Sequence, residues 1–133
     1  MRWFELRRPA GASSGGWTLF QEGTVGGDGL SRWVPSIAMD AGGDIALGYS
    51  TSSESVFPSI VVTGRRAADD PGVLTVGETT VVAGTASQNA TNRWGDYSAM
   101  SVDPVDGETF WYTNEVTASA RRWGTRIAAF RVD

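Results

Sequence analysis

Two Arg–Trp pairs, Arg32–Trp33 and Arg93–Trp94, each follow a Gly–Thr pair at the same distance and lie 61 positions apart. A guanidinium binds a carboxylate through two parallel hydrogen bonds, and an indole offers a flat face to a ring. The pair therefore has the residue types of a binding site for a carboxylated sugar. Repetition at equivalent places favours a second interpretation, a structural fastening within each unit, because sites are usually assembled from non-equivalent loops.

Asp96 and Tyr97 follow the second pair where the first copy has Val34–Pro35, so the repeat is broken there. A tyrosine hydroxyl near a carboxylate can act as a nucleophile in glycoside hydrolysis, and Glu115 could supply a further carboxylate. Asp96, Tyr97 and Glu115 are the catalytic candidates. The alternative is a tyrosine packed between sheets with its hydroxyl bonded to the backbone. We expect no catalysis by this chain alone.

Acidic residues gather in two short segments, a glycine-containing one with Asp40 and Asp44 and one containing proline and glycine with Asp103, Asp106 and Glu108. Calcium accepts oxygen ligands of this kind. Neither segment has the spaced ligands of a twelve-residue calcium loop, and aspartate in a tight turn normally bonds its own backbone. We therefore predict two hairpin turns and no cofactor, with calcium at Asp103 and Asp106 as the alternative.

Composition excludes several other chemistries. All 11 basic residues of the 133-residue chain are arginine, and lysine, histidine and cysteine are absent. A Ser-His-Asp triad, a cysteine nucleophile, a Schiff-base lysine and a His/Cys zinc site are thus impossible within this chain. The net charge of −4 with scattered arginines argues against a nucleic-acid partner. No apolar stretch is long enough for a membrane span, and residues 1–16 lack the apolar core of a signal peptide.

The elements that position these residues are expected to be strands. Glycine accounts for 17 of the 133 residues, against a usual share of about 7%. Two units, 17–77 and 78–133, each hold four strand-like segments, and residues 1–16 form an extra strand with a Gly/Ser-rich connector. Apolar residues alternate in segments 36–39 and 45–49 with small residues between them, which predicts sheets buried on both faces.

A four-stranded unit of this length is typical of a β-propeller blade, because blades bury both faces against their neighbours. The predicted fold is therefore all-β, with two consecutive four-stranded propeller-type blades and an extra N-terminal strand. Two blades cannot close a ring, since the smallest propellers have about four. We expect the partners to be the remaining blades of a parent chain or identical subunits.

The whole chain also resembles a known family. The segments that carry the resemblance are RWFELRR, SRWVPSIAMDAGGDIALGYSTSSESVFPSIVVTGRR, GETTVVAG, RWGDYSAMSVDPVDGETFWYTNE and WGTRIAAF. They are similar to the C-terminal part of large uncharacterised bacterial secreted proteins with sialidase-like (BNR-type) propeller repeats. The resemblance implies an extracellular, multi-blade β-propeller without implying an activity. Ser101–Phe110 departs from the Asp-box of sialidase blades because its loop is two residues longer.

We expect this chain to be a non-catalytic structural or interaction portion of a larger sialidase-like propeller, whose loops contribute to binding a glycan or a protein. The ligand-binding candidates are Arg32, Trp33, Arg93, Trp94, Asp96 and Tyr97. One alternative is part of a sialidase-like glycoside hydrolase that uses Arg93, Asp96, Tyr97 and Glu115. Another is a small self-associating protein whose copies complete a ring.

Overall fold

The structure is a computed structural model that describes residues 1–11, 13–119 and 122–132. Those residues form nine strands and no helix, which confirms the all-β class. Residues 2–7 form a strand as expected, but this strand pairs with the strand at Thr18–Thr24, which the sequence assigns to the first four-stranded unit. The strands are β1 (Arg2–Arg7), β2 (Thr18–Thr24), β3 (Ser31–Met39), β4 (Ile45–Ser52), β5 (Ser59–Arg65), β6 (Val76–Val82), β7 (Ala99–Val102), β8 (Phe110–Ser119) and β9 (Arg122–Phe130).

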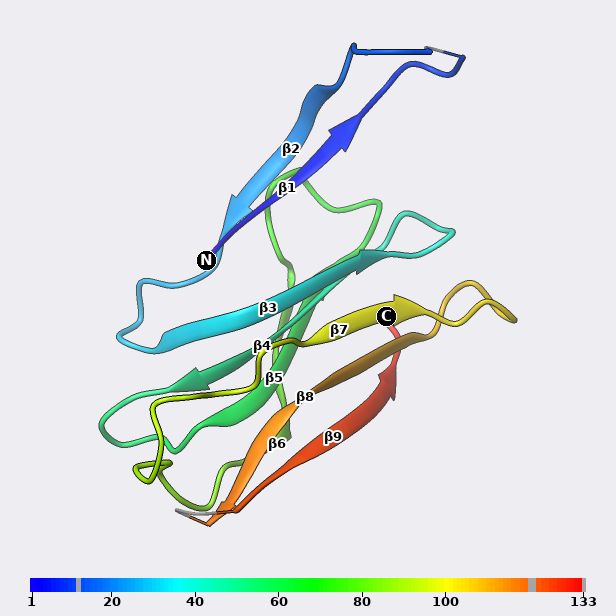
Figure 1. Ribbon diagram of the computed structural model, residues 1–133. Coiled ribbons are helices and arrows are strands. Elements are labelled where there is room, and N and C mark those ends of the chain that lie inside the picture. Colours follow the sequence, from blue (N-terminus) through cyan, green and yellow to red (C-terminus); the bar gives the residue numbers. More distant parts are fainter. Residues whose placement is uncertain (12, 120–121, 133) are drawn as a thin grey trace.

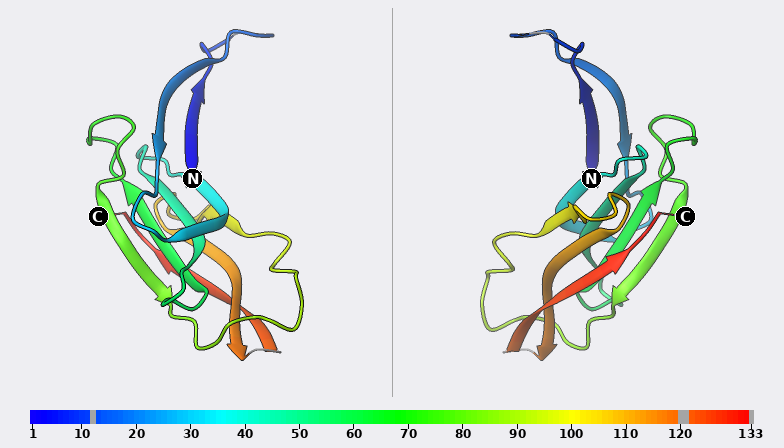
Figure 2. Two further views of the ribbon diagram at one scale, coloured as in Figure 1. Left: turned by 90° about the vertical axis from the view of Figure 1, so that its left-hand side faces the viewer. Right: turned by 90° about the vertical axis from the view of Figure 1, so that its right-hand side faces the viewer.

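The strands make three open antiparallel sheets (Figure 1). The N-terminal sheet is the hairpin β1-β2, the central sheet has the order β3-β4-β5-β6, and the C-terminal sheet has the order β7-β8-β9. The hairpin projects from one end of the molecule in both views of Figure 2. Strand β6 belongs to the central sheet, so the boundary that the sequence places between residues 77 and 78 falls inside a strand.

Both acidic segments form hairpin turns, as the sequence predicts. In the β3-β4 turn the amide of Asp40 donates to the carbonyl of Asp44 over 2.9 Å. In the β7-β8 turn Gly107 has a φ of 69°, which an L side chain rarely adopts, and its amide donates to the carbonyl of Asp103 over 2.9 Å. The two turns also meet, because the amide of Ala41 donates to the carbonyl of Gly107 over 3.0 Å.

The two middle strands of the central sheet are covered on both faces, which confirms two-sided burial for segment 45–49. The expectation is wrong for segment 36–39 on the edge strand β3, where Ile37 and Met39 are 40% and 48% exposed. Every residue of β5 and all but the last of β4 are buried. One face packs with the N-terminal hairpin in a cluster of Trp3, Ile45, Leu47, Tyr49 and Val61. The other face packs with the C-terminal sheet in a cluster of Ala46, Ile60, Val62, Met100, Phe110, Tyr112 and Val132. Because neighbouring residues on a strand point to opposite faces, both clusters draw on the same two strands.

Each end sheet has large exposed apolar side chains on its outer face, although the connector between β6 and β7 covers Thr117 on the outer side of β8. On β1, Trp3 is buried, whereas Phe4 and Leu6 are 51% and 56% exposed. On β9, Trp123 and Ile127 are 68% and 66% exposed. Ile127 pairs with Thr113 on β8. Because Tyr112, the neighbour of Thr113, faces the central sheet, Thr113 and Ile127 point to the outer face. The outer faces of the stack therefore present large apolar side chains to solvent.

Gly48 on β4 allows the central and C-terminal sheets to approach. A Cβ at this position would lie 2.5 Å from Cζ of Tyr112, which is buried. We expect Gly48→Ala to lower the free energy of unfolding by about 1–3 kcal/mol, because the ring and the sheet must shift. Chemical denaturation measures this change.

Gly77→Ala on β6 is the matched control, since nothing lies within 4 Å of a Cβ there. We expect its stability to stay within about 0.5 kcal/mol of the parent, in line with other surface substitutions. Equal losses in the two variants would contradict the close contact between the sheets.

Candidate functional site

The two Arg–Trp pairs occupy different environments. The Arg32 side chain is only 4% exposed and is held by two carboxylates. Its Nη2 lies 2.6 Å from Oδ2 of Asp28, and its Nε donates to Oε1 of Glu78 over 2.8 Å. The Arg93 side chain is 71% exposed and pairs with both carboxylate oxygens of Asp96. The repeat in sequence is therefore not a repeat in structure at these arginines.

A buried tyrosine completes the cluster around Arg32. The Arg32 guanidinium carbon lies 5.9 Å from the centroid of the Tyr49 ring, and the Tyr49 hydroxyl donates to Oε1 of Glu78 over 2.5 Å. Burial raises the pKa of the Tyr49 hydroxyl, and its bond to Glu78 raises the pKa further. The hydroxyl therefore stays protonated and acts as a donor. Because Glu78 lies on β6, the cluster joins three strands of the central sheet.

The two tryptophans meet where the central and C-terminal sheets face each other. The ring centroids of Trp33 and Trp94 are 5.7 Å apart, with the planes at 72°. Nε1 of Trp94 donates to Oγ of Ser50 over 3.2 Å, and Nδ2 of Asn114 donates to the same oxygen over 3.1 Å. Ser50 is fully buried, so these bonds connect the sheets inside the molecule.

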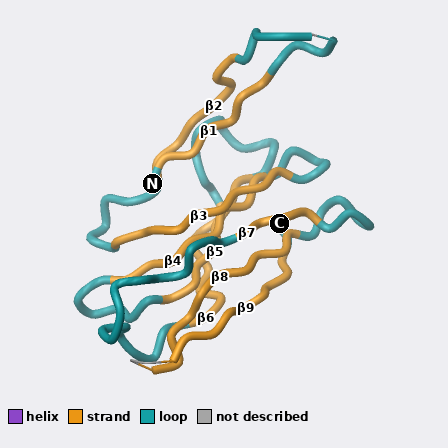
Figure 3. The backbone as a smooth tube through the Cα atoms, in the orientation of Figure 1, coloured by secondary structure: helices purple, strands orange, loops and turns teal. Residues whose placement is uncertain are grey.

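The long connector between β6 and β7, teal in Figure 3, is fixed by similar bonds near its end. Oγ of Ser98 donates to the carbonyl of Val34 over 2.8 Å, and the amide of Met100 donates to Oγ of Ser36 over 2.8 Å. Val34 has a φ of 50°, which is rare for a β-branched residue, and β3 has an irregularity in its pairing between Trp33 and Ser36.

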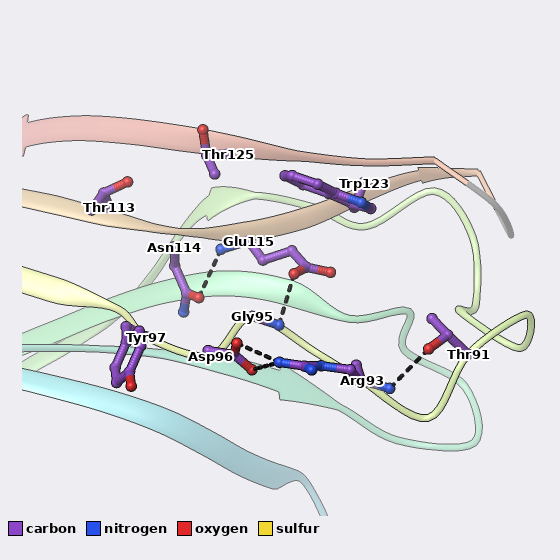
Figure 4. Close-up of a pocket in the computed structure, with 10 residues that line it drawn as sticks. All are labelled: Thr91, Arg93, Gly95, Asp96, Tyr97, Thr113, Asn114, Glu115, Trp123 and Thr125. Atoms are coloured by element: carbon purple, nitrogen blue, oxygen red, sulfur yellow. Dashed lines mark hydrogen bonds and ion pairs between the residues drawn. The ribbon is translucent and has the colours of Figure 1, made fainter.

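This connector forms one wall of a pocket of about 600 Å³, and β8 and β9 form the other (Figure 4). The pocket brings together Arg93, Asp96, Tyr97 and Glu115, whereas Arg32 and Trp33 do not line it. Tyr97 is 90% exposed, so it is not packed between sheets. The full lining consists of Thr91, Arg93, Gly95, Asp96, Tyr97, Thr113, Asn114, Glu115, Trp123 and Thr125.

Glu115 has a free hydrogen-bond acceptor in this pocket. Its Oε2 accepts the amide of Gly95 over 2.7 Å, whereas its Oε1 is buried and has no partner among the described residues. A buried oxygen without a donor costs free energy, so a group that donates a hydrogen bond would be favoured here. Arg93 offers less charge to an anionic ligand, because its Nη2 already pairs with both carboxylate oxygens of Asp96.

The carboxylates considered for calcium at Asp103 and Asp106 already accept hydrogen bonds from the protein, and Asp106 also pairs with Arg131. Asp106 accepts the amides of Glu108 and Thr109 over 3.0 and 2.9 Å and the Thr109 hydroxyl over 2.6 Å. The Thr109 hydroxyl and these amides hold the pKa of Asp106 well below its usual range. Asp103 accepts Nε1 of Trp111 over 2.9 Å. Within the described ranges, no three His, Cys, Asp or Glu side chains are grouped so that they could hold a metal ion.

Sequence reasoning missed three residues of these sites. Asp28 and Glu78 hold Arg32, and Ser50 receives the Trp94 indole. Glu78 is 46 positions from Arg32, and no local pattern connects the two. Ser50 had a usable signal, because it directly follows Tyr49, and Tyr49 and Tyr112 lie 63 positions apart, close to the spacing of the two Arg–Trp pairs.

No protein-family model, curated protein or solved structure matches the chain. No helix long and apolar enough to cross a membrane occurs in the part of the chain that the structure describes. The interpretation of the site therefore depends on its geometry.

The contrast between the two arginines predicts different costs of removal. Arg32→Met leaves Glu78 and Asp28 without their buried cation, so we expect the free energy of unfolding to fall by about 2 kcal/mol or more. Arg93→Met removes an exposed pair, which is worth less than about 1 kcal/mol. Urea denaturation of both variants measures the difference. Equal losses in the free energy of unfolding would show that Arg32 does not stabilise the sheet through a buried ion-pair cluster.

Proposed function

We propose that this chain is a non-catalytic structural and interaction portion of a larger, extracellular β-propeller. The observation that carries the proposal is the difference between inner and outer sheet faces. The inner faces form two apolar clusters, whereas Phe4, Leu6, Trp123 and Ile127 on the outer faces are each about half exposed or more. Exposed apolar surface of this kind is typical of a face that another element covers.

The order of the strands supports the same proposal. The central sheet follows the chain as a four-stranded meander, the C-terminal sheet has three strands in the same order, and the N-terminal hairpin has two. The chain can be interpreted as the last two strands of one blade, a whole blade, and the first three strands of another. The remaining blades of a parent chain, or identical subunits, would cover the outer faces.

The pocket gives less support to a sialidase-like hydrolase. Arg93 is the one arginine among the described lining residues, and it is already paired with Asp96. A carboxylated sugar would therefore meet an arginine whose charge Asp96 already compensates.

The test is self-association of the isolated chain. We expect light scattering after size-exclusion chromatography to show association that increases with concentration, because each copy offers two apolar outer faces. Leu6→Lys combined with Ile127→Lys should shift the population to monomer with little change in the free energy of unfolding, since both side chains are exposed.

Val105→Lys is the control, because Val105 is 94% exposed but lies in the β7-β8 turn, away from the outer faces. It should associate as the parent does. A parent chain that stays monomeric at all accessible concentrations, or a Val105→Lys variant that dissociates as fully as the double variant, would overturn the proposal.

A further inference from the structure

The pocket lies on the C-terminal sheet at the place that corresponds to the Trp94 site on the central sheet. Tyr49 on β4 and Tyr112 on β8 are equivalent in the repeat, and each is buried within one of the two inner clusters. Ser50 directly follows Tyr49, and Thr113 directly follows Tyr112. Each therefore points to the face of its sheet opposite to the tyrosine before it. Ser50 receives the indole of Trp94, whereas Thr113 lines the pocket.

The occupied site shows what such a place accepts. Trp94 comes from the connector before β7 and crosses to the central sheet, where its indole N–H finds a buried hydroxyl oxygen and its ring contacts Trp33. A neutral side chain thus supplies one hydrogen bond and a broad apolar surface between two sheets.

The pocket offers the complement of an indole. Oε1 of Glu115 is a buried acceptor without a donor, and Trp123 and Tyr97 are exposed aromatic side chains on its walls. Arg93 and Asp96 compensate each other's charge, so they add no preference for an ion. A volume of about 600 Å³ accommodates an aromatic side chain together with the backbone that carries it.

We propose that this pocket receives the tryptophan of a further Arg-Trp repeat segment, whose indole N–H donates to Oε1 of Glu115. The inference rests on the proposed structural role in a larger propeller, and it names the contact through which the next sheet would bind. It assigns Glu115 a direct binding role in recognition between units.

The test uses the full chain and a synthetic peptide that copies residues 91–98, Thr-Asn-Arg-Trp-Gly-Asp-Tyr-Ser. In an NMR titration we expect shifts of the amides of Gly95, Thr113 and Glu115 and of the Trp123 indole. A peptide with 1-methyltryptophan, which lacks the indole N–H, should bind about tenfold more weakly, because the Glu115 oxygen stays unpaired.

Glu115→Gln keeps an oxygen for the Gly95 amide but turns an amide N–H into the pocket, so we expect it to weaken the unmodified peptide about tenfold. Glu108→Gln is the matched control, since Glu108 is exposed and pairs with Arg131, and neither residue lines the pocket. It should bind the peptide as the parent does.

Equal binding of the methylated peptide, or unchanged binding by Glu115→Gln, would overturn the assignment. So would shifts at these residues with neutral monosaccharides in the absence of any peptide binding, because the pocket would then be a sugar site. If the peptide fails but the outer-face variants still abolish self-association, only the pocket assignment is wrong. If both tests fail, the proposed structural role in a larger propeller is wrong as well.

Discussion

The burial of β4 and β5 on both faces is the constraint on which the rest of the structure depends. Each square ångström of apolar surface removed from water contributes about 25 cal/mol, and these two strands present apolar side chains in both directions. A single sheet cannot satisfy such strands, so the N-terminal hairpin and the C-terminal sheet are both needed as cover. Small residues such as Ala46 and Gly48 keep the sheets close.

The same stacking places the residues that could recognise a partner. Because Trp94 and Ser98 are bonded to the central sheet, the connector that carries them is held beside β8. Its other side chains, Arg93 and Tyr97, then face outward around Glu115. An interaction inside the molecule thereby forms a pocket on its outside, at the face where another sheet would be expected.

The sequence predicted the strands and turns better than their grouping. Alternation and turn residues are local, so the buried strand 45–52 and the turn at Asp40–Asp44 could be derived from neighbouring residues. A repeat has no intrinsic starting point, and whether β6 joins the sheet before or after it depends on pairing with β5. The candidate site was similar: Arg93, Asp96, Tyr97 and Glu115 were named and share a pocket, but the different fates of the two arginines depend on Asp28 and Glu78, which no motif connects to them.

Hydroxyl-radical footprinting of the dilute full chain measures the coverage of individual side chains, and so tests whether the inner faces are covered and the outer faces open. We expect Trp3, Tyr49 and Tyr112 to resist oxidation while Phe4 and Trp123 are modified rapidly. Protection of Phe4 and Trp123 equal to that of Tyr49 in a monomeric sample would contradict it, since the outer faces would then already be covered by the chain itself.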